Sequence, residues 1–534
     1  MREHGVRVER DGAPAPLGAR LVVVVLAAAF LTVLAPPRNW HWLHWIAYLP
    51  MFWALDPRTP RGNRWLSWVY GGAGLITLFY WIAGTITTFA PVVPTAAAWV
   101  VVALFGVVYG VPHILLWTAV HPLRDRLGSL WVLAWPAWFV LIEWGAMWAT
   151  LFPFNHGVSQ YRAVYTWQLV SVTGIWGLTF LLAFVNAVIA EALYRAQEGR
   201  RLPFGSLAGA GCTLAAVVSF GAWRYERVET LLRSADTVSV AQIQTAKDMV
   251  WRLSHRPKEA FEEWMTLTRS IPDGVDLTVW PEGACPFSLA PTADRVPPES
   301  RLLSRLAREQ ELELLVGAGT YVRQEGQDGD REAVNFNSVY HFHRDGEMGE
   351  RYDKMVPLPF GEYWPLGDLL RSFAYELGIG NFRPGDRAVV FDGDAARIAS
   401  PICYEAILPH VCRRFEGAEL FVTITNDAWF GDTSAPHLHA MLAAVRATEF
   451  GVPMVRSAYT GVSFVVEPHG AILHETAPFT DVARVVDVRL GQVETLYRRF
   501  GEWFVLVCGL GLAGALLGAA RLRSTSGRNE PITK

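Results

Sequence analysis

The chain has 534 residues, of which 51% are hydrophobic and 18% are charged, and its formal net charge is −3. Charge is unevenly distributed: residues 21–222 contain 15 charged side chains, whereas residues 223–500 contain 69. Soluble proteins carry about 25% charged residues, so the total averages an apolar half and a half of ordinary soluble composition. This pattern excludes a single soluble domain, a disordered chain and a wholly membrane-embedded transporter. The near-neutral charge and the lack of a basic stripe argue against a nucleic-acid partner.

Eight apolar segments are predicted to cross a membrane, seven before the charged region and one after it. They are residues 21–37, 41–55, 66–90, 93–120, 130–151, 165–194, 204–222 and 502–520. Most are near the roughly 20 residues that span a hydrocarbon core. The second segment is shorter and rich in Trp and His, which favours a tilted or interfacial position. The first follows a basic leader, as in a signal peptide, but another apolar segment comes directly after it, so we interpret it as an uncleaved helix.

The placement of basic residues predicts the orientation in the membrane. Sixteen basic side chains fall on one side of the eight segments: Arg2, Arg7, Arg10, Arg20, Arg58, Arg61, Arg64, Arg124, Arg126, Arg195, Arg200, Arg201, Arg521, Arg523, Arg528 and Lys534. The short loops of the other side contain only Arg38 and Arg162. Because basic loops remain in the cytoplasm, both termini are expected to be cytoplasmic and residues 223–500 to lie outside.

Three of the polar residues within the apolar segments suggest a function or a contact between helices. Glu143 lies within FVLIEWGAMW, where an ionisable side chain indicates either a functional site or a carboxylate bound to a neighbouring helix near the interface. The sequence favours neither interpretation. His113 and Asn186 are interpreted as polar contacts between helices.

The charged region alternates short β-rich runs with helical ones. Strands are predicted at 237–244, 276–283, 312–321, 337–346, 396–405, 420–427, 453–461 and 463–473, and helices at 257–271, 300–310, 410–418 and 437–451. Continuous apolar strands separated by helices predict sheets that are covered by helices on one or both faces.

Three residues of this region form a chemically consistent set. Glu282 and Cys403 each end a predicted strand, and Lys354 lies between them in the sequence. Ligands bind beyond the carboxyl ends of the strands in α/β sheets, so the three side chains are expected to converge. A cation lowers the pKa of a thiol, a carboxylate removes its proton, and an ammonium group stabilises an oxyanion. This set suits acyl transfer through a thioester.

Each residue of the set also has an ordinary structural explanation. A single cysteine is usually a small buried hydrophobic residue, and glutamate and lysine are usually surface residues. Lysine is scarce, however, with only four in the chain, and Lys354 lies in a proline-rich apolar stretch. The five cysteines include no CxxC pair, so neither a disulfide framework nor a zinc site is expected.

Longer motifs around these residues resemble the nitrilase superfamily, which uses a Glu-Lys-Cys triad on an α-β-β-α sandwich. The motifs are WPEG (280–283), YDKMVPLPFGEYWP (352–365), SPICYE (400–405) and TNDAWFGD (425–432). The stretch 425–461 is similar to the membrane-bound branch, the apolipoprotein N-acyltransferases. So are IEW (142–144), FPFNHGVSQYR (152–162) and TGIWGLTFLLAFVNA (173–187) in the apolar half. The resemblance implies an eight-helix transmembrane bundle plus a nitrilase-like domain, arranged as 1–223, 224–497 and 498–534.

The resemblance also implies roles for individual residues. Glu282 matches the general base, Lys354 the oxyanion-stabilising cation and Cys403 the acylated nucleophile. Residues matching supporting positions of the active site are Glu362, Tyr404 and Glu405, and residues matching substrate or lid positions are Trp251, Phe360 and Trp429. No metal or organic cofactor is implied.

A few positions depart from the family pattern. Met355 and Val356 stand where histidines are common, Thr245 and Ala246 where Gly-Asn is common, and Tyr459 changes a usual RxTNTG segment. An arginine that usually follows the Glu-Trp pair of the apolar half is also missing. These departures concern substrate recognition and loop contacts rather than the three catalytic candidates.

The reaction implied by the resemblance has two bilayer-anchored substrates. An acyl chain passes from a phospholipid to Cys403 and then to the α-amine of the diacylglyceryl-cysteine of an apolipoprotein. The implied setting is a bacterial inner membrane, with a monomeric enzyme whose catalytic domain faces the periplasm. Three alternatives stay open: a membrane-anchored nitrilase-type amidase that uses water, an acyltransferase with a different amine acceptor, and a scaffold built on a decayed nitrilase domain.

Overall fold

The computed structural model describes residues 15–149, 154–247, 256–292, 295–325, 331–365 and 381–526. They form two compact units. The helical unit comprises the described residues of Met1–Tyr80, Trp99–Ala222 and Phe500–Lys534. The sandwich unit comprises the described residues of Trp81–Ala98 and Trp223–Arg499. The segment Trp81–Ala98 therefore belongs to the sandwich unit, although its sequence lies within the apolar half.

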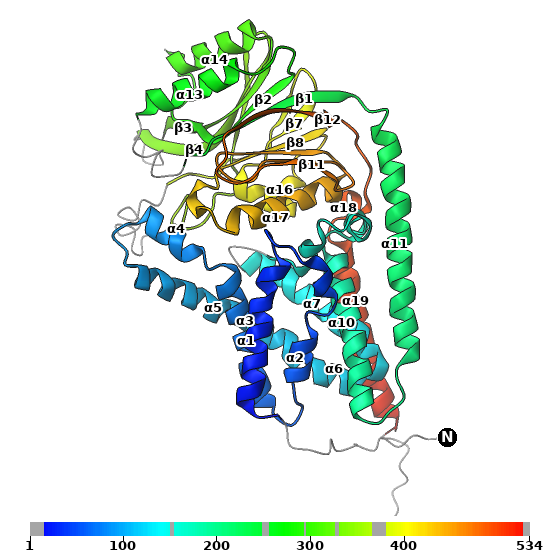
Figure 1. The fold of residues 1–534 in the computed structure, drawn as a ribbon. Helices are drawn as coiled ribbons and strands as arrows, with labels where there is room; N and C mark the ends of the chain where they lie inside the picture. Colours follow the sequence, from blue (N-terminus) through cyan, green and yellow to red (C-terminus); the bar gives the residue numbers. More distant parts are fainter. Residues whose placement is uncertain are drawn as a thin grey trace, which may run out of the picture. The chain divides into compact units, whose positions relative to one another are not determined.

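The apolar half folds into helices of very different lengths (Figure 1). In chain order these are α1 (Leu17–Leu34), η1 (His41–Trp45), α2 (Leu49–Ala54), α3 (Pro60–Leu78), α4 (Ile82–Phe89), α5 (Thr95–Thr118), α6 (Val120–Leu127), η2 (Gly128–Leu130), α7 (Trp131–Ala149), η3 (His156–Gln160), α8 (Val164–Trp167), α9 (Val170–Thr173), α10 (Trp176–Gln197) and α11 (Phe204–Leu232). The chain ends with α18 (Leu496–Phe500) and α19 (Trp503–Ser526). Within the helical unit, α1 packs on α3, and α7 packs on both α10 and α19.

Five helical runs of the described residues are long and apolar enough to cross a membrane: Leu17–Leu34, Thr95–Trp148, Trp176–Gln197, Phe204–Leu232 and Trp503–Arg523. A sixth results if α3 and α4, which are bent by 53° at a short break, act as one span. The run Thr95–Trp148 has 54 residues, more than twice the ~20 that one crossing needs. The predicted total of eight crossings stays a prediction.

Two predicted segments differ in form from a single long helix. Residues 41–55 form the short helices η1 and α2, with Pro50 in the first turn of α2, because proline suits a helix start and not its interior. The predicted segment 66–90 is interrupted after Leu78, where three aromatic residues of lower helix propensity follow. The helix predicted at 204–222 continues to Leu232 as α11, since no proline or glycine ends it.

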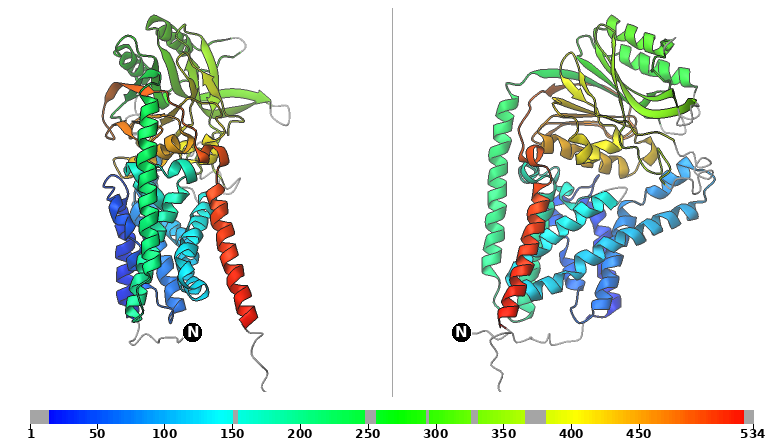
Figure 2. Two further views of the ribbon diagram at one scale, coloured as in Figure 1. Left: turned by 90° about the vertical axis from the view of Figure 1, so that its right-hand side faces the viewer. Right: turned by 180° about the vertical axis from the view of Figure 1, so that it is seen from behind.

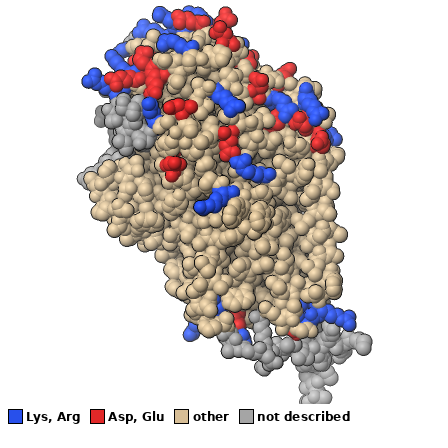
Figure 3. Space-filling model, viewed as in Figure 1, with Lys and Arg blue, Asp and Glu red and all other residues tan. Residues whose placement is uncertain are grey.

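The surface of the helical unit matches its apolar composition. Exposed side chains along its helices include Leu26, Leu104, Val108 and Leu510, the last with 74% of its surface accessible. In the face drawn in Figure 3, most of the helical unit's surface carries neither acidic nor basic side chains, whereas the sandwich unit shows many of both. Exposed apolar surface of this extent requires an apolar solvent or a partner.

The sandwich unit contains two six-stranded sheets. Their strands are β1 (Thr237–Gln244), β2 (Leu277–Cys285), β3 (Glu313–Glu325), β4 (Arg331–Phe342), β5 (Met348–Asp353), β6 (Val390–Asp392), β7 (Arg397–Ala399), β8 (Leu420–Thr425), β9 (Met454–Ala458), β10 (Phe464–Val466), β11 (Ile472–Glu475) and β12 (Val482–Arg489). The orders are β12-β1-β2-β3-β4-β5 and β11-β10-β9-β8-β7-β6. In both sheets three central strands are parallel and the outer pairs are antiparallel.

Helices cover the outer faces of the two sheets (Figures 1 and 2). The sandwich helices are α13 (Pro257–Arg269), α14 (Pro298–Glu309), η4 (Cys403–Ile407), α16 (Pro409–Cys412), η5 (Ala428–Phe430) and α17 (Ala435–Phe450). The helices α13 and α14 contact β2 and β4 of the first sheet, α17 contacts β9 of the second, and β2 meets β8 and β9 between the sheets. The predicted α-β-β-α sandwich is therefore confirmed.

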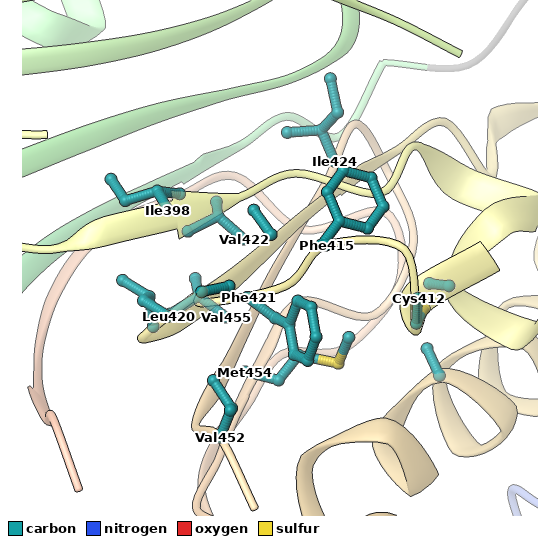
Figure 4. Packing of buried hydrophobic residues seen from close by; sticks show 14 of the residues in the cluster. Ile398, Cys412, Phe415, Leu420, Phe421, Val422, Ile424, Val452, Met454 and Val455 are labelled. Atoms are coloured by element: carbon teal, nitrogen blue, oxygen red, sulfur yellow. The ribbon is translucent and has the colours of Figure 1, made fainter. Parts of the chain in front are cut away.

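Two apolar clusters hold the layers together. One fills the space between the sheets and extends under α17, with Ile398, Val422 and Met454 among its buried members (Figure 4). The other lies between the first sheet and its helices, around Trp264 and Trp280. The parallel strands are mostly buried on both faces and rich in apolar residues, as is usual in parallel sheets; β8, LFVTIT, is buried at every position.

Candidate active site

Glu282 lies at an irregularity in the pairing of β2 with its neighbouring strand. The pairing of β2 with β3 shifts between Trp280 and Cys285, and Pro281 within this stretch cannot donate to a ladder because it has no N–H. Gly283 follows with a φ of 64°, a conformation that glycine adopts without strain. The local sequence thus turns the Glu282 side chain out of the regular sheet pattern.

Lys354 directly follows β5, and a hydrogen bond to β4 fixes its backbone. Its backbone N–H donates to the carbonyl of Asn337, with N and O 2.8 Å apart. Its Nζ lies 2.7 Å from Oε2 of Glu362 and 3.5 Å from Oε1 of Glu282. The side-chain amide of Asn337 donates to both carboxylates, with both distances 2.6 Å. Lys354 and Asn337 therefore each contact both Glu282 and Glu362.

The charge state of Lys354 follows from these neighbours. The side chain is 1% exposed, and burial by itself would lower the pKa of the ammonium group. Glu362, Glu282 and Cys403 outweigh burial and raise the pKa of Lys354 above its usual range. Lys354 is thus a buried, permanent cation.

The second oxygen of Glu282 is held from a different sheet. The backbone N–H of Asn426, which follows β8, donates to Oε2 of Glu282 at 2.8 Å. Oε1 accepts from Asn337, so both carboxylate oxygens have fixed donors. A carboxylate fixed in this way has a defined direction from which it can take a proton.

Cys403 lies in a strained turn, not at the end of a strand as predicted. Regular pairing in β7 stops at Ala399, and Cys403 begins the short helix η4 with a φ of 53°. Non-glycine residues in this region are uncommon and cluster at functional sites. Burial and then Glu282 raise the pKa of the thiol, while Lys354 and the Thr425 hydroxyl act in the opposite direction. The resting thiol is therefore protonated and needs a base.

Glu405 joins the turn that carries Cys403 to the segment that follows Lys354. Its oxygens accept from the Tyr352 hydroxyl at 2.9 Å, from the backbone N–H groups of Met355 and Val356 at 2.7 and 3.0 Å, and from that of Ile402 at 2.8 Å. Burial raises the pKa of Glu405 to about 7, against the influence of Lys354 and these donors. Met355 and Val356 bind Glu405 through backbone groups, so these two contacts do not depend on the identity of their side chains.

A second buried charge cluster lies beside Thr425. Asp427 accepts from Nη2 of Arg456 at 2.8 Å, and its other oxygen lies 2.8 Å from Nδ1 of His439. Arg456 and then His439 lower the pKa of Asp427 below its usual value, although burial by itself would raise it. A Cβ at Gly461 would lie 2.1 Å from a carboxylate oxygen of Asp427, so glycine is required for this close approach.

The remaining predicted site residues differ in their placement. Tyr404 is buried beside Cys403 in η4. Phe360 is 40% exposed, has a φ of 62° and meets Trp364 edge-on with ring centroids 5.5 Å apart. Trp429 lies in η5 and stacks on Phe89 of α4. Trp251 lies outside the described residues.

Some contacting residues were missed by sequence reasoning. Asn337, Asn426 and Tyr352 make direct hydrogen bonds to the three glutamates of the site. Tyr352 and Asn426 belong to motifs that were recognised, YDKM and TNDAW, but roles were assigned only to other residues of these motifs. Asn337 lies in a strand without a motif, and Phe89 lies in a segment that was assigned only to the membrane.

Comparisons with known proteins cover both halves of the chain. Residues 237–498 match the model of the carbon-nitrogen hydrolase family, and residues 27–188 match the apolipoprotein N-acyltransferase N-terminal domain. The apolipoprotein N-acyltransferase of Geobacter metallireducens is 32% identical over 518 residues, which is 93% of this chain and 94% of that protein. The protein of the same name from Agrobacterium fabrum is 30% identical over 488 residues, covering 85% and 87%.

Solved structures add little to these matches. A carbon-nitrogen hydrolase from Helicobacter pylori covers 50% of this chain and 95% of its own, at 17% identity and a TM-score of 0.36. The assignment rests on the sequence relatives, which align with nearly the whole chain. The chain belongs to the apolipoprotein N-acyltransferase family, a membrane-bound branch of the nitrilase superfamily.

Proposed function

We propose that this chain transfers an acyl chain from a membrane phospholipid, through a thioester on Cys403, to the α-amine of the diacylglyceryl-cysteine of an apolipoprotein. The observation that carries the proposal is the convergence of a base, a cation and a thiol: Glu282, Lys354 and Cys403 are buried together and influence one another electrostatically. Membership of the family supplies the class of acceptor.

In the first half-reaction, the Cys403 thiol gives its proton to Glu282, and the thiolate attacks the carbonyl carbon of the phospholipid ester. The raised pKa of the thiol makes this transfer necessary, because few thiolates exist without it. The C–O bond then breaks, and the departing alkoxide takes the proton from Glu282. The products are an acyl thioester and a lysophospholipid.

Lys354 stabilises the negative oxygen of the tetrahedral intermediate. Its positive charge is secured by the ion pair with Glu362, which leaves Glu282 free for the proton transfer. A preorganised cation in a water-poor site contributes more than the same cation in water, since it needs no reorganisation as charge develops. Glu362 is thus proposed to maintain the position and charge of Lys354.

In the second half-reaction, the neutral α-amine of the acceptor attacks the thioester carbon. Glu282 accepts the proton that the nitrogen loses, the C–S bond breaks, and the Cys403 thiolate recovers a proton from Glu282. One nucleophile serves both substrates in turn, so ping-pong kinetics are expected. Water must be kept from the thioester between the two steps.

The apolar helices suit this pair of substrates. Both substrates are anchored in a bilayer, and a membrane-bound enzyme holds their reacting groups at high effective concentration. We propose that the eight predicted segments cross the bacterial inner membrane, with cytoplasmic termini and a periplasmic catalytic region. The proposed domains are 1–223, 224–497 and 498–534, in a monomer.

The proposal is tested by the intact mass of the purified full-length protein after incubation with phospholipid vesicles. An added acyl mass that hydroxylamine removes, and that is lost in Cys403→Ala, is expected. Cys212→Ala and Cys285→Ala are matched controls, since they remove an exposed and a buried thiol, and both are expected to retain the adduct. Adding a diacylated lipopeptide should then transfer the acyl mass to the peptide amine.

Two outcomes would contradict the proposal in different ways. No adduct with any phospholipid would exclude the donor and the thioester. An adduct that is lost to water at the same rate with and without the lipopeptide would identify an amidase-type hydrolase instead.

A further inference from the structure

The helix α4 contacts η5, the short helix that begins two residues after Asn426. Phe89 of α4 stacks on Trp429 of η5, with ring centroids 3.7 Å apart and an interplanar angle of 10°. Trp81, which precedes α4, meets Phe430 of η5 edge-on, with centroids 4.9 Å apart. The first contact is a close, nearly face-to-face stack, and the second is the edge-to-face arrangement that aromatic rings prefer. The contacts lie within the sandwich unit, to which Trp81–Ala98 belongs.

The loop between β8 and η5 is short and internally bonded. The side-chain oxygen of Asn426 accepts from the backbone N–H of Ala428 at 3.1 Å. Asp427, between them, is fixed by Arg456 and His439. Asn426 is thus connected to η5 through one fixed residue and one hydrogen bond, so a shift of η5 is expected to reach Asn426.

The same Asn426 provides the backbone N–H that binds Oε2 of Glu282 at 2.8 Å. A donor at this oxygen stabilises the ionised carboxylate and fixes its direction. The contacts thus run from two aromatic residues of the apolar half, through η5 and Asn426, to the candidate base. Each step is a direct contact in the structure.

We propose that Phe89 and Trp81 of the α4 segment are positioning residues for Glu282: they hold η5 so that the Asn426 amide stays on the carboxylate. The inference rests on the proposed function, since Glu282 must act as the base for its position to matter. It assigns a role in the proton transfer to a segment that the sequence placed only in the membrane.

A purely structural role for α4 predicts a different result. If Phe89 only adds packing, its loss lowers the stability of the unit and reduces the acylation rate by the same factor at every pH. If Phe89 positions Glu282, its loss removes a donor from the charged carboxylate. The acid limb of the pH profile then moves to higher pH, because the base is protonated more easily.

The test compares Phe89→Ala, Phe89→Leu and Phe89→Tyr in the full-length protein. The rate of thioester formation with phospholipid vesicles is measured by intact mass from pH 5 to 9. The alanine and leucine variants are expected to acylate about tenfold more slowly at neutral pH, with the acid limb shifted up by about one pH unit. Phe89→Tyr keeps a stacking ring, so its acylation rate and its acid limb are expected to match those of the wild type.

Thr88→Ala is the matched control on the same helix. Thr88 is exposed, and its hydroxyl donates to the carbonyl of Gly84 in α4, so this change should leave the profile unaltered. Thermal unfolding of each variant shows whether it is folded, and the leucine variant retains apolar bulk in case the alanine variant does not fold.

The outcomes separate the inference from the proposed function. A wild-type protein that forms no thioester contradicts the proposed function and the inference with it. A wild-type protein that acylates, with Phe89→Leu either unchanged or slowed equally at all pH values, overturns the inference alone. A shifted acid limb that Phe89→Tyr restores supports it.

Discussion

The two units of the molecule bury polar groups in different ways. In the sandwich unit, the buried Asp427, which follows β8, is paired with the buried Arg456 of β9. In the helical unit, Asn186 is completely buried and bonds to backbone groups: it accepts from the N–H of Tyr48 at 3.0 Å and donates to the carbonyl of His44 at 3.0 Å. Ion pairs also occur in the helical unit, as between Arg124 of α6 and the buried Glu191 of α10 at 2.7 Å, but at Asn186 the contact between helices is made by neutral hydrogen bonds.

Glu143 shows how the helical unit accommodates an ionisable group. One of its oxygens accepts from the Thr179 hydroxyl at 2.8 Å, and the other is bonded to the backbone and ring of His156. These contacts connect α7, α10 and η3 within the helical unit. Of the two interpretations from the sequence, the structure places Glu143 among inter-element hydrogen bonds, the kind of contact that joins helices in an apolar solvent.

The largest stability effect is expected from breaking the charge pair of the sandwich unit. Arg456→Met leaves Asp427 buried and without its strongest partner, which is expected to cost about 3–5 kcal/mol. For a unit of this size the midpoint of thermal unfolding should fall by about 10 °C. Labelling of the buried Cys412 on heating reports this unit specifically, and Cys508 reports the helical unit.

Arg456→Lys is the control for the charge pair. Lysine keeps the positive charge but not the planar group that also bonds to the carbonyl of Val462, so an intermediate midpoint is expected. An Arg456→Met protein in which Cys412 becomes reactive at the wild-type temperature would show that the pair does not stabilise the sandwich.

A smaller effect, dependent on pH, is expected from Glu405. Its pKa in the folded protein is about 7, above the ordinary 4.5, so the folded state binds the proton more tightly than the unfolded state. The resulting stability is complete below about pH 4.5 and is lost as the pH rises through 7, by about 3 kcal/mol. Thermal midpoints measured from pH 4.5 to 8 should decline less steeply in Glu405→Gln. Equal slopes in both proteins would contradict the raised pKa.

The smallest effect is expected from the helical unit. Asn186→Leu keeps the branched shape and the number of heavy atoms of the side chain but removes the bonds to Tyr48 and His44, at about 1 kcal/mol for such contacts in a membrane. On heating, Cys508 should become reactive at a temperature a few degrees lower than in the wild type, while the temperature at which Cys412 reacts should not change. Thr213→Val is the control, because the exposed Thr213 bonds only within its own helix. If Asn186→Leu lowered the unfolding midpoint as much as Arg456→Met does, the expected difference between the two units would be contradicted.

The sequence predicted the layers of the sandwich better than its turns. The β-rich runs 237–244 and 420–425 became strands inside the two sheets, where most of their positions are buried, as their composition predicts. The strand predicted at 396–405 stopped at Ala399, since Glu405 bonds to the N–H of Ile402 and closes a turn. That bond connects residues through a side chain, which hydrophobic periodicity does not report.

In the candidate site, too, residues with a sequence pattern were predicted and residues without one were missed. Glu282, Lys354 and Cys403 were identified by their chemistry and their motifs, and they lie together. Asn337 was missed because its importance comes from two carboxylates that are distant in the sequence. The contribution of residues 81–98 to the sandwich unit was also missed, because composition alone assigns an apolar segment to apolar surroundings.

The membership of α4 in the sandwich unit has a consequence for biosynthesis. Phe89 is made about 340 residues before Trp429, so at roughly 5–20 residues per second it leaves the ribosome about 20–70 seconds before its stacking partner. During that interval the ring has no Trp429 to cover it. The sandwich unit therefore cannot be completed from its contiguous sequence alone, and α4, which is made first, must wait for the part of the unit that is made last.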